Sequence, residues 1–178
     1  DFPENSYICY MDQATWYMDK EITEYASSLS SDKNQFSHLS LRELAETVYK
    51  GSDFISTHPK QDSLSFYSTS AKFNSEKKII KAEGVHYIKV ADAIIFPENN
   101  QITILKNAEM IPLENSKIIT NAITKYHEIN NAKVKIESRK SYTGSGDYIY
   151  IGGDSVKHPV HFKEISVNPS SETVARAE

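Results

Sequence analysis

Cysteine is almost absent from the chain: Cys9 is the only one among its 178 residues. A single cysteine excludes an intrachain disulfide and any metal site built from several thiolates. Catalysis by this thiol would need a base beside it, and the sequence shows no recognisable partner. We therefore interpret Cys9 as a quiet, partly buried thiol.

The chain also lacks a long hydrophobic run and a cluster of positive charge. No stretch approaches the ~20 apolar residues that a membrane-spanning helix requires. The net charge is −4, and the short pairs Lys77-Lys78 and Arg139-Lys140 are interpreted as solvated turns. We therefore expect no nucleic-acid partner, because binding to phosphates normally needs a basic surface.

Recognisable catalytic and metal-binding motifs are missing as well. His158 and His161 lie in an expected strand, where successive side chains alternate between faces, so the two rings should point apart. His86 falls in an apolar alternation and is interpreted as an interior histidine. The stretch "TGSGD" at 143–147 is not a Gly-x-Ser-x-Gly motif, and we interpret it as a flexible or bulged strand start. We expect no enzyme, metal or cofactor, with a β-helical enzyme of scattered acids and bases as the alternative.

The first part of the chain shows a helical spacing of apolar residues. Steps of three and four predict an amphipathic helix over 11–29, formed by Met11, Ala14, Met18, Ile22, Tyr25 and Leu29. A second interpretation stays open for this segment. Ala14, Trp16 and Ile22 have the same offsets as Ala71, Phe73 and Ile79, which would make the segment a degenerate copy of a β-repeat and hence a strand.

A further helix is expected over 40–50. Ser40 followed by Glu43 is a capping-box pattern, and Gly51 stands where a helix usually ends. The apolar residues Leu41, Leu44, Ala45 and Val48 would form its buried stripe. Residues 1–52 are therefore expected to be an N-terminal helical or mixed segment.

From residue 53 onward the apolar period shortens towards two, which is typical of strands with one buried face. The alternation includes Ile80, Ala82, Ile88, Val90, Ile94, Phe96, Ile102 and Ile104. The Tyr- and Gly-rich stretch 141–165 is predicted to form one hairpin. The fold class is therefore predicted to be mainly β: a stacked β-hairpin solenoid or twisted jelly-roll-like sheet with one or two N-terminal helices, its β-repeat domain covering 53–178.

An alanine followed by a charged residue marks each unit of a repeat. Ala82, Ala108 and Ala132 are about 25 residues apart, a spacing typical of stacked supersecondary units. Ala177 marks a last copy, "VNPSSETVARAE" at 167–178, which stops where the equivalent of Gly84 would follow. A small residue at a fixed place suits a crowded position. We expect the native protein to continue beyond Glu178, and we expect bare strand edges to allow end-to-end self-association.

The repeat phrase resembles a known family. The pattern A-x-F-N-x-x-x-x-I-I-x-A-x-G-x-x-x-I at 71–88 resembles the unit of the OstA-like family of lipopolysaccharide-transport proteins, and "VADAIIFPENNQITILKNAEM" at 90–110 looks like a second unit. The resemblance covers about 64–136, and 160–178 more weakly. Gly84 lacks the Asn that follows it in the family pattern, and Asn107 lacks the preceding Gly.

The resemblance implies a non-enzymatic, extracytoplasmic β-module in the periplasm or at the outer membrane. Its partners would be a lipid or other apolar ligand, other envelope proteins, or further repeats of the same chain. Carried onto this sequence, the lining of an acyl-chain groove would be Phe73, Ile80, Ile88, Val90, Phe96, Ile104 and Met110. We therefore expect a structural module of a larger bacterial envelope protein.

The tyrosines offer an alternative function. Eleven are present, and three of them lie in the predicted hairpin: Tyr142, Tyr148 and Tyr150. Exposed together, these rings would form a platform for a glycan or a protein partner. Pairing across strands is the commoner use of such rings.

Overall fold

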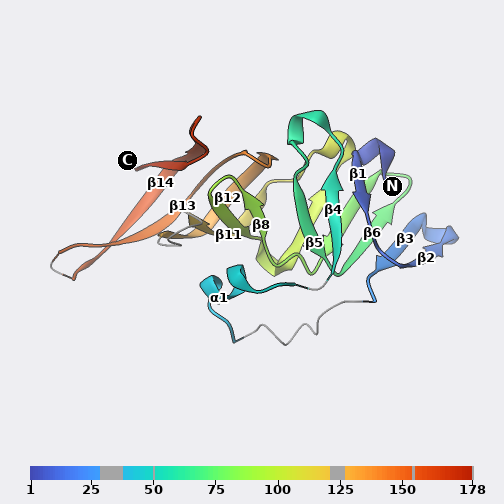
Figure 1. Ribbon diagram of the computed structural model, residues 1–178, viewed down its shortest axis with the longest axis horizontal. Coiled ribbons are helices and arrows are strands. Elements are labelled where there is room, and N and C mark those ends of the chain that lie inside the picture. The colour runs from blue at the N-terminus through green and yellow to red at the C-terminus, as the bar shows by residue number, and fades with distance from the viewer. Residues whose placement is uncertain (29–37, 50, 121–126, 154, 178) are drawn as a thin grey trace.

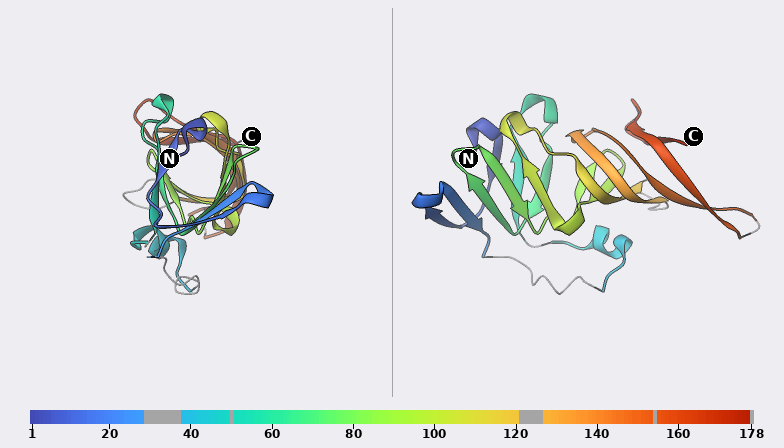
Figure 2. Two further views of the ribbon diagram at one scale, coloured as in Figure 1. Left: turned by 90° about the vertical axis from the view of Figure 1, so that its right-hand side faces the viewer. Right: turned by 180° about the vertical axis from the view of Figure 1, so that it is seen from behind.

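The computed structural model describes residues 1–28, 38–49, 51–120, 127–153 and 155–177. These residues form antiparallel sheets that curl into an elongated half-barrel (Figure 1). Seen along the long axis, the strands wrap around a common centre (Figure 2). The prediction of a mainly β fold is therefore confirmed.

Three sheets make up this wall. The first has the order β1-β4-β5, with bounds β1 Tyr7–Cys9, β4 Ser52–Ser56 and β5 Ser65–Ser68. The second has the order β10-β7-β6-β3-β2, with bounds β2 Gln13–Tyr17, β3 Ile22–Ala26, β6 Ser70–Asn74, β7 Ile79–Glu83 and β10 Gln101–Ile104. The third has the order β15-β14-β13-β12-β11-β9-β8, with bounds β8 Ile88–Val90, β9 Ala93–Phe96, β11 Leu113–Thr120, β12 His127–Ser138, β13 Ser141–Ile151, β14 Lys157–Val167 and β15 Thr173–Ala177.

The strand order does not follow the chain unit by unit. β10 pairs with β7, while β8 and β9 between them join the seven-stranded sheet. The N-terminal strands also enter these sheets, because β1 pairs with β4 and β3 pairs with β6. The pairing therefore shows curled antiparallel sheets, and it does not show a solenoid of successive hairpins.

The predicted helix over 11–29 is wrong, and the strand interpretation of this segment is right. β2 and β3 form a hairpin around a 3₁₀ turn at Met18–Lys20, and Glu21 takes a left-handed conformation. Threonine, tyrosine and tryptophan favour strands, and the pairing of β3 with β6 satisfies its backbone groups. Leu29 lies outside the described residues.

The helix expected over 40–50 is present but shorter. α1 spans Leu41–Glu46, and both hydrogen bonds of the capping box between Ser40 and Glu43 form. The helix ends where Thr47 turns to an extended conformation, before Gly51. β-branched Thr47 and Val48 lose side-chain freedom in a helix, which accounts for the early end. Within the described residues α1 is the only α-helix.

One large core occupies the inside of the curled wall. Its fully buried side chains include Ile80, Ala82, Ile88, Val90, Ile102 and Ile104, so most of the predicted alternation is confirmed. The repeat-marking residues Ala82, Ala108 and Ala132 have no exposed surface, as expected of a crowded position. Ala177, in contrast, is exposed.

The alternation changes phase at the β8–β9 turn. Val90 and Ala93 are partners across this hairpin, and Ala91 between them has a φ of 52°. The buried face therefore passes from even to odd positions, and Ile95 joins the main core. Ile94 and Phe96 point to the other face, where Ala45 of α1 covers them. The prediction that Phe96 faces the same interior as Ile88 is wrong for this reason.

The Tyr- and Gly-rich hairpin is confirmed as β13 and β14. Its register pairs Tyr148 with Val160 and shifts between Gly144 and Gly146, so the stretch 143–147 contains a bulge. A Cβ on Gly144 would lie 2.4 Å from the carbonyl oxygen of Lys133. The bulge bends the long strands and helps to curl the sheet.

Candidate functional site

The residues expected to line an acyl-chain groove lie mostly in the packed core. Ile80, Ile88, Val90 and Ile104 have no exposed surface, and Met110 is 2% exposed. All five belong to one cluster of mutually packed side chains. The centre of the wall is thus filled by the protein itself.

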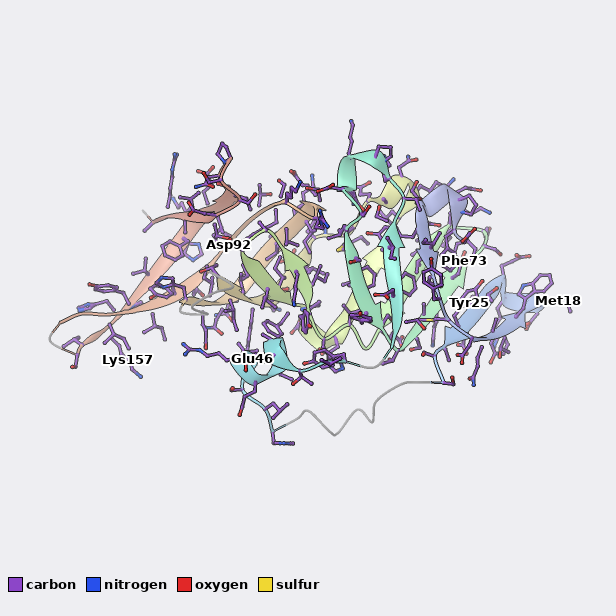
Figure 3. All side chains as sticks on the ribbon, in the orientation of Figure 1. Met18, Tyr25, Glu46, Phe73, Asp92 and Lys157 are labelled. Carbon is purple, nitrogen blue, oxygen red and sulfur yellow. The ribbon has the colours of Figure 1, made fainter. Side chains whose placement is uncertain are left out.

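The other two expected lining residues lie elsewhere. Phe73 is half-buried at the N-terminal end, where its ring centroid is 5.1 Å from that of Phe2 (Figure 3). Phe96 faces α1 on the outer side of the sheet. The structure therefore does not bring the seven residues together around one open space.

An apolar cavity of about 200 Å³ lies at the C-terminal end of the wall. Strands β11 to β15 form it together, since each contributes at least one side chain. Its lining residues are Thr120, His127, Ile129, Tyr148, Phe162, Thr173 and Ala175. Buried Ile129 belongs to the main core, and Phe162 and Ala175 pack against that core. Side chains of the main core, or packed against it, therefore line this cavity.

Aromatic contacts shape one wall of this cavity. The rings of Tyr148 and Phe162 stack with centroids 5.8 Å apart and an angle of 24°. The Tyr148 hydroxyl lies 3.0 Å from Nδ1 of His127, and the two rings meet edge to face. These contacts hold the Tyr148 ring in the wall of the cavity.

Polar contacts fix the position of β15, which contributes Thr173 and Ala175 to the cavity. Thr173 donates its backbone N–H and its hydroxyl to Oδ1 of Asp92, over 2.9 Å and 2.6 Å. The Tyr142 hydroxyl lies 2.8 Å from Oγ1 of Thr173 and donates to it, because the threonine proton already goes to Asp92. This chain of hydrogen bonds ties β15 to the β8–β9 turn, which positions Ala175 at the cavity.

The three hairpin tyrosines do not form one surface. Tyr142 has no exposed surface and belongs to the core. Tyr148 is half-buried in the cavity wall, and Tyr150 is 53% exposed further along β13. A platform of all three rings is therefore not what the structure shows.

The buried tyrosines predict a loss of stability in alkali. Burial raises the pKa of Tyr7 and of Tyr142 above the ordinary value of 10.0. Above about pH 10 the unfolded chain releases these protons while the folded chain keeps them, so the free energy of unfolding falls by about 1.4 kcal/mol per pH unit and tyrosine. Denaturant titrations between about pH 9 and 12 should show that the free energy of unfolding decreases less steeply with pH in Tyr142→Phe than in the wild type.

The matched control is Tyr150→Phe, at an exposed tyrosine, which should have the same pH dependence as the wild type. Equal slopes of the free energy of unfolding against pH for wild type and Tyr142→Phe would contradict the expectation.

A second, larger cleft of about 570 Å³ lies between β5 and the β8–β9 turn. Its lining includes Asp53, Tyr67, Tyr87, Lys89, Asp92, Arg139 and Lys140. Several of these charges are already paired: Arg139 and Lys140 lie 3.5 Å and 3.1 Å from Asp62, and Lys89 sits 5.5 Å above the Tyr87 ring. The cleft therefore offers fewer free groups to a ligand than its composition indicates.

The histidines occupy separate places. His161 and Asp147 share a hydrogen bond of 2.6 Å, whereas His158 is opposite Tyr150 across the hairpin. His86 is half-buried and stacks on Tyr49 with ring centroids 4.1 Å apart, and burial lowers its pKa.

In the part of the chain that the structure describes, no three His, Cys, Asp or Glu side chains are placed to hold a metal ion. Within the same residues no α-helix has the length and hydrophobicity of a membrane span.

Sequence reasoning missed the floor of the apolar cavity. Ile129 precedes a register shift between Asn130 and Lys133, which separates it from the alternation of Ala132 and Val134. Ala175 lies in a short strand without an alternating pattern. Of the residues that line this cavity, only Tyr148 was expected from the sequence to be functional, as part of a proposed tyrosine platform. Compared with protein-family models, curated proteins and solved structures, the chain shows no match.

Proposed function

We propose that this chain is a non-catalytic binding module that holds the end of an apolar chain in the cavity formed by β11 to β15. The observation that carries the proposal is the apolar floor of Ile129, Phe162 and Ala175, which is continuous with the core yet open to a ligand. A cavity of about 200 Å³ is smaller than the ~300–1,000 Å³ of sites that enclose a drug-sized ligand. The ligand therefore inserts one alkyl end and leaves its remainder outside.

The wider setting of this proposal comes from the sequence. The resemblance of residues 71–88 and 90–110 to OstA-like units favours an extracytoplasmic module of a larger envelope protein, built as a twisted jelly-roll-like sheet. Such a module would act beside other envelope proteins or further repeats of the same chain. The strands β2 and β15 at the outer edges of their sheets support contacts of this kind.

The alternative function, a glycan- or protein-binding platform, has less support. It would depend on Tyr148 and Tyr150 alone, because Tyr142 is buried. The Tyr148 ring is also engaged by Phe162 and His127. One fully available ring is a weak basis for stacking against a sugar.

Filling the cavity tests the proposal. Ala175→Phe places a phenyl ring where the ligand would insert, so we expect a fluorescent fatty acid to bind at least about tenfold more weakly. The measurement is a fluorescence titration of wild type and variant, with thermal unfolding to confirm that both are folded. Ala175→Leu repeats the test with a smaller side chain.

Val174→Phe is the matched control, since Val174 is the next residue of β15 and is 46% exposed on its other face. It should bind the fatty acid as the wild type does. Equal binding by Ala175→Phe and wild type, with both folded, would show that the apolar chain does not occupy this cavity.

A further inference from the structure

The hairpin of β13 and β14 extends beyond the rest of its sheet. The pairing of β12 with β13 ends at Tyr148, and β15 pairs with β14 only from Phe162 onward. Between these limits the hairpin is a ribbon of two strands. It forms one extreme of the molecule in Figure 1, and Lys157 lies near its tip in Figure 3.

Both faces of this ribbon carry exposed apolar side chains. Tyr150 is opposite His158 on one face, while Ile149 and Ile151 lie on the other, opposite Pro159 and Lys157. The exposed fractions are about one half for each apolar residue: Ile149 52%, Tyr150 53%, Ile151 58% and Val156 49%. Exposed apolar residues are usually scattered, so a group of four at one tip indicates a binding surface.

The arrangement limits what can cover the tip. A folded protein that docks on one face would leave the other face in water. A strand that adds to the edge of β14 would meet Pro159 and Lys157, two residue types that disfavour edge pairing. A lipid surface, in contrast, surrounds a narrow tip on all sides. We propose that the β13–β14 tip inserts into the interfacial region of a phospholipid bilayer.

The chemistry of the tip fits a shallow position. Tyrosine is favoured at the membrane–water interface, and Lys157 can extend its ammonium group towards the headgroups. The outer edges of the ribbon have backbone groups without strand partners in the described sheet, and these need water or headgroup oxygens. Residues 148–163 contain Lys157 and Lys163 against one acidic residue, Asp154. Insertion is therefore driven by apolar burial, with little dependence on lipid charge or salt.

The hairpin of β2 and β3 at the opposite end provides a contrast. Trp16 and Met18 are 63% and 69% exposed there (Figure 3 labels Met18). Four carboxylates surround these residues in the sequence: Asp12, Asp19, Glu21 and Glu24. Bringing these four carboxylates to a bilayer would cost more hydration than bringing the single acidic residue of 148–163, Asp154, so the β13–β14 tip is the one that inserts.

Vesicle binding tests the inference. Wild-type protein should co-sediment with phosphatidylcholine vesicles, and added phosphatidylglycerol or salt should change the bound fraction little. The double variant Ile149→Ser, Ile151→Ser removes exposed side chains only, so it should fold normally and partition at least about tenfold more weakly. Val48→Ser, at a residue that is 89% exposed elsewhere, should bind as the wild type does.

The single tryptophan reports on the other end of the molecule. Because Trp16 lies in the β2–β3 hairpin, its emission should not shift when vesicles bind. A blue shift would show that the wrong hairpin has been assigned. Unchanged binding of the double variant, or binding to anionic vesicles alone, would also overturn the inference. If the wild type binds no vesicles and its sedimentation coefficient differs from that of the double variant, a second copy of the chain covers the tip. This result would also overturn the inference.

None of these outcomes depends on the fatty-acid titration of Ala175→Phe, so the two proposals fail separately.

Discussion

Ile104→Asp is expected to leave the chain largely unfolded at 37 °C. Ile104 has no exposed surface and lies in β10, opposite Ile80 of β7. The substitution removes the ~1.5–3 kcal/mol that burial of an isoleucine contributes, and it adds a carboxyl group without a partner in an apolar core. The combined loss of about 5 kcal/mol or more is comparable with the whole stability of a typical domain. Circular dichroism and thermal unfolding measure the effect.

The matched control makes the same chemical change at the surface. Ile111 follows β10 in the chain and is 43% exposed, so Ile111→Asp should lower the free energy of unfolding by less than about 1 kcal/mol. Equal stability of Ile104→Asp and wild type would show that the side chain does not face a packed core.

Gly144→Val is expected to have the second largest effect. Any side chain at Gly144 begins 2.4 Å from the carbonyl oxygen of Lys133, a backbone atom of the neighbouring strand that cannot move aside without breaking pairs. Relief of this overlap must separate β12 from β13 in the middle of the seven-stranded sheet. We expect a loss of about 3 kcal/mol or more in the free energy of unfolding, measured by denaturant titration.

Thr143→Val is the control for this substitution. Thr143 is exposed and adjacent in β13, and valine is well suited to a strand, so its stability should stay close to that of the wild type. Should Gly144→Val be as stable as Thr143→Val, the close approach of β12 and β13 at the bulge would be disproved.

The sequence predicted the elements whose signals are local. Alternating apolar residues identified the strands around Ile80 and Ile104, since a strand with one buried face needs nothing beyond its own pattern. The capping box at Ser40 and Glu43 likewise marked the start of α1, because its hydrogen bonds join residues three apart.

Features that depend on partners distant in sequence were not predictable. The spacing of Met18, Ile22 and Tyr25 suits a helix, but β3 is fixed by its pairing with β6. Phe96 changes face because a two-residue turn shifts the alternation, and the helix that covers it comes from far earlier in the chain. The apolar cavity requires five strands to meet at one end, and no segment of sequence shows that alone.

Photo-crosslinking with a diazirine fatty acid would locate the bound apolar chain on the protein. We expect mass spectrometry to find the label on the strands that form the cavity, at Ile129, Tyr148, Phe162 and the residues around Ala175. Peptides containing Ile80, Ile88 and Ile104 should stay unlabelled, because their side chains fill the centre of the wall. Label on those three isoleucines would contradict the account, since it would show that the core opens to hold the apolar chain.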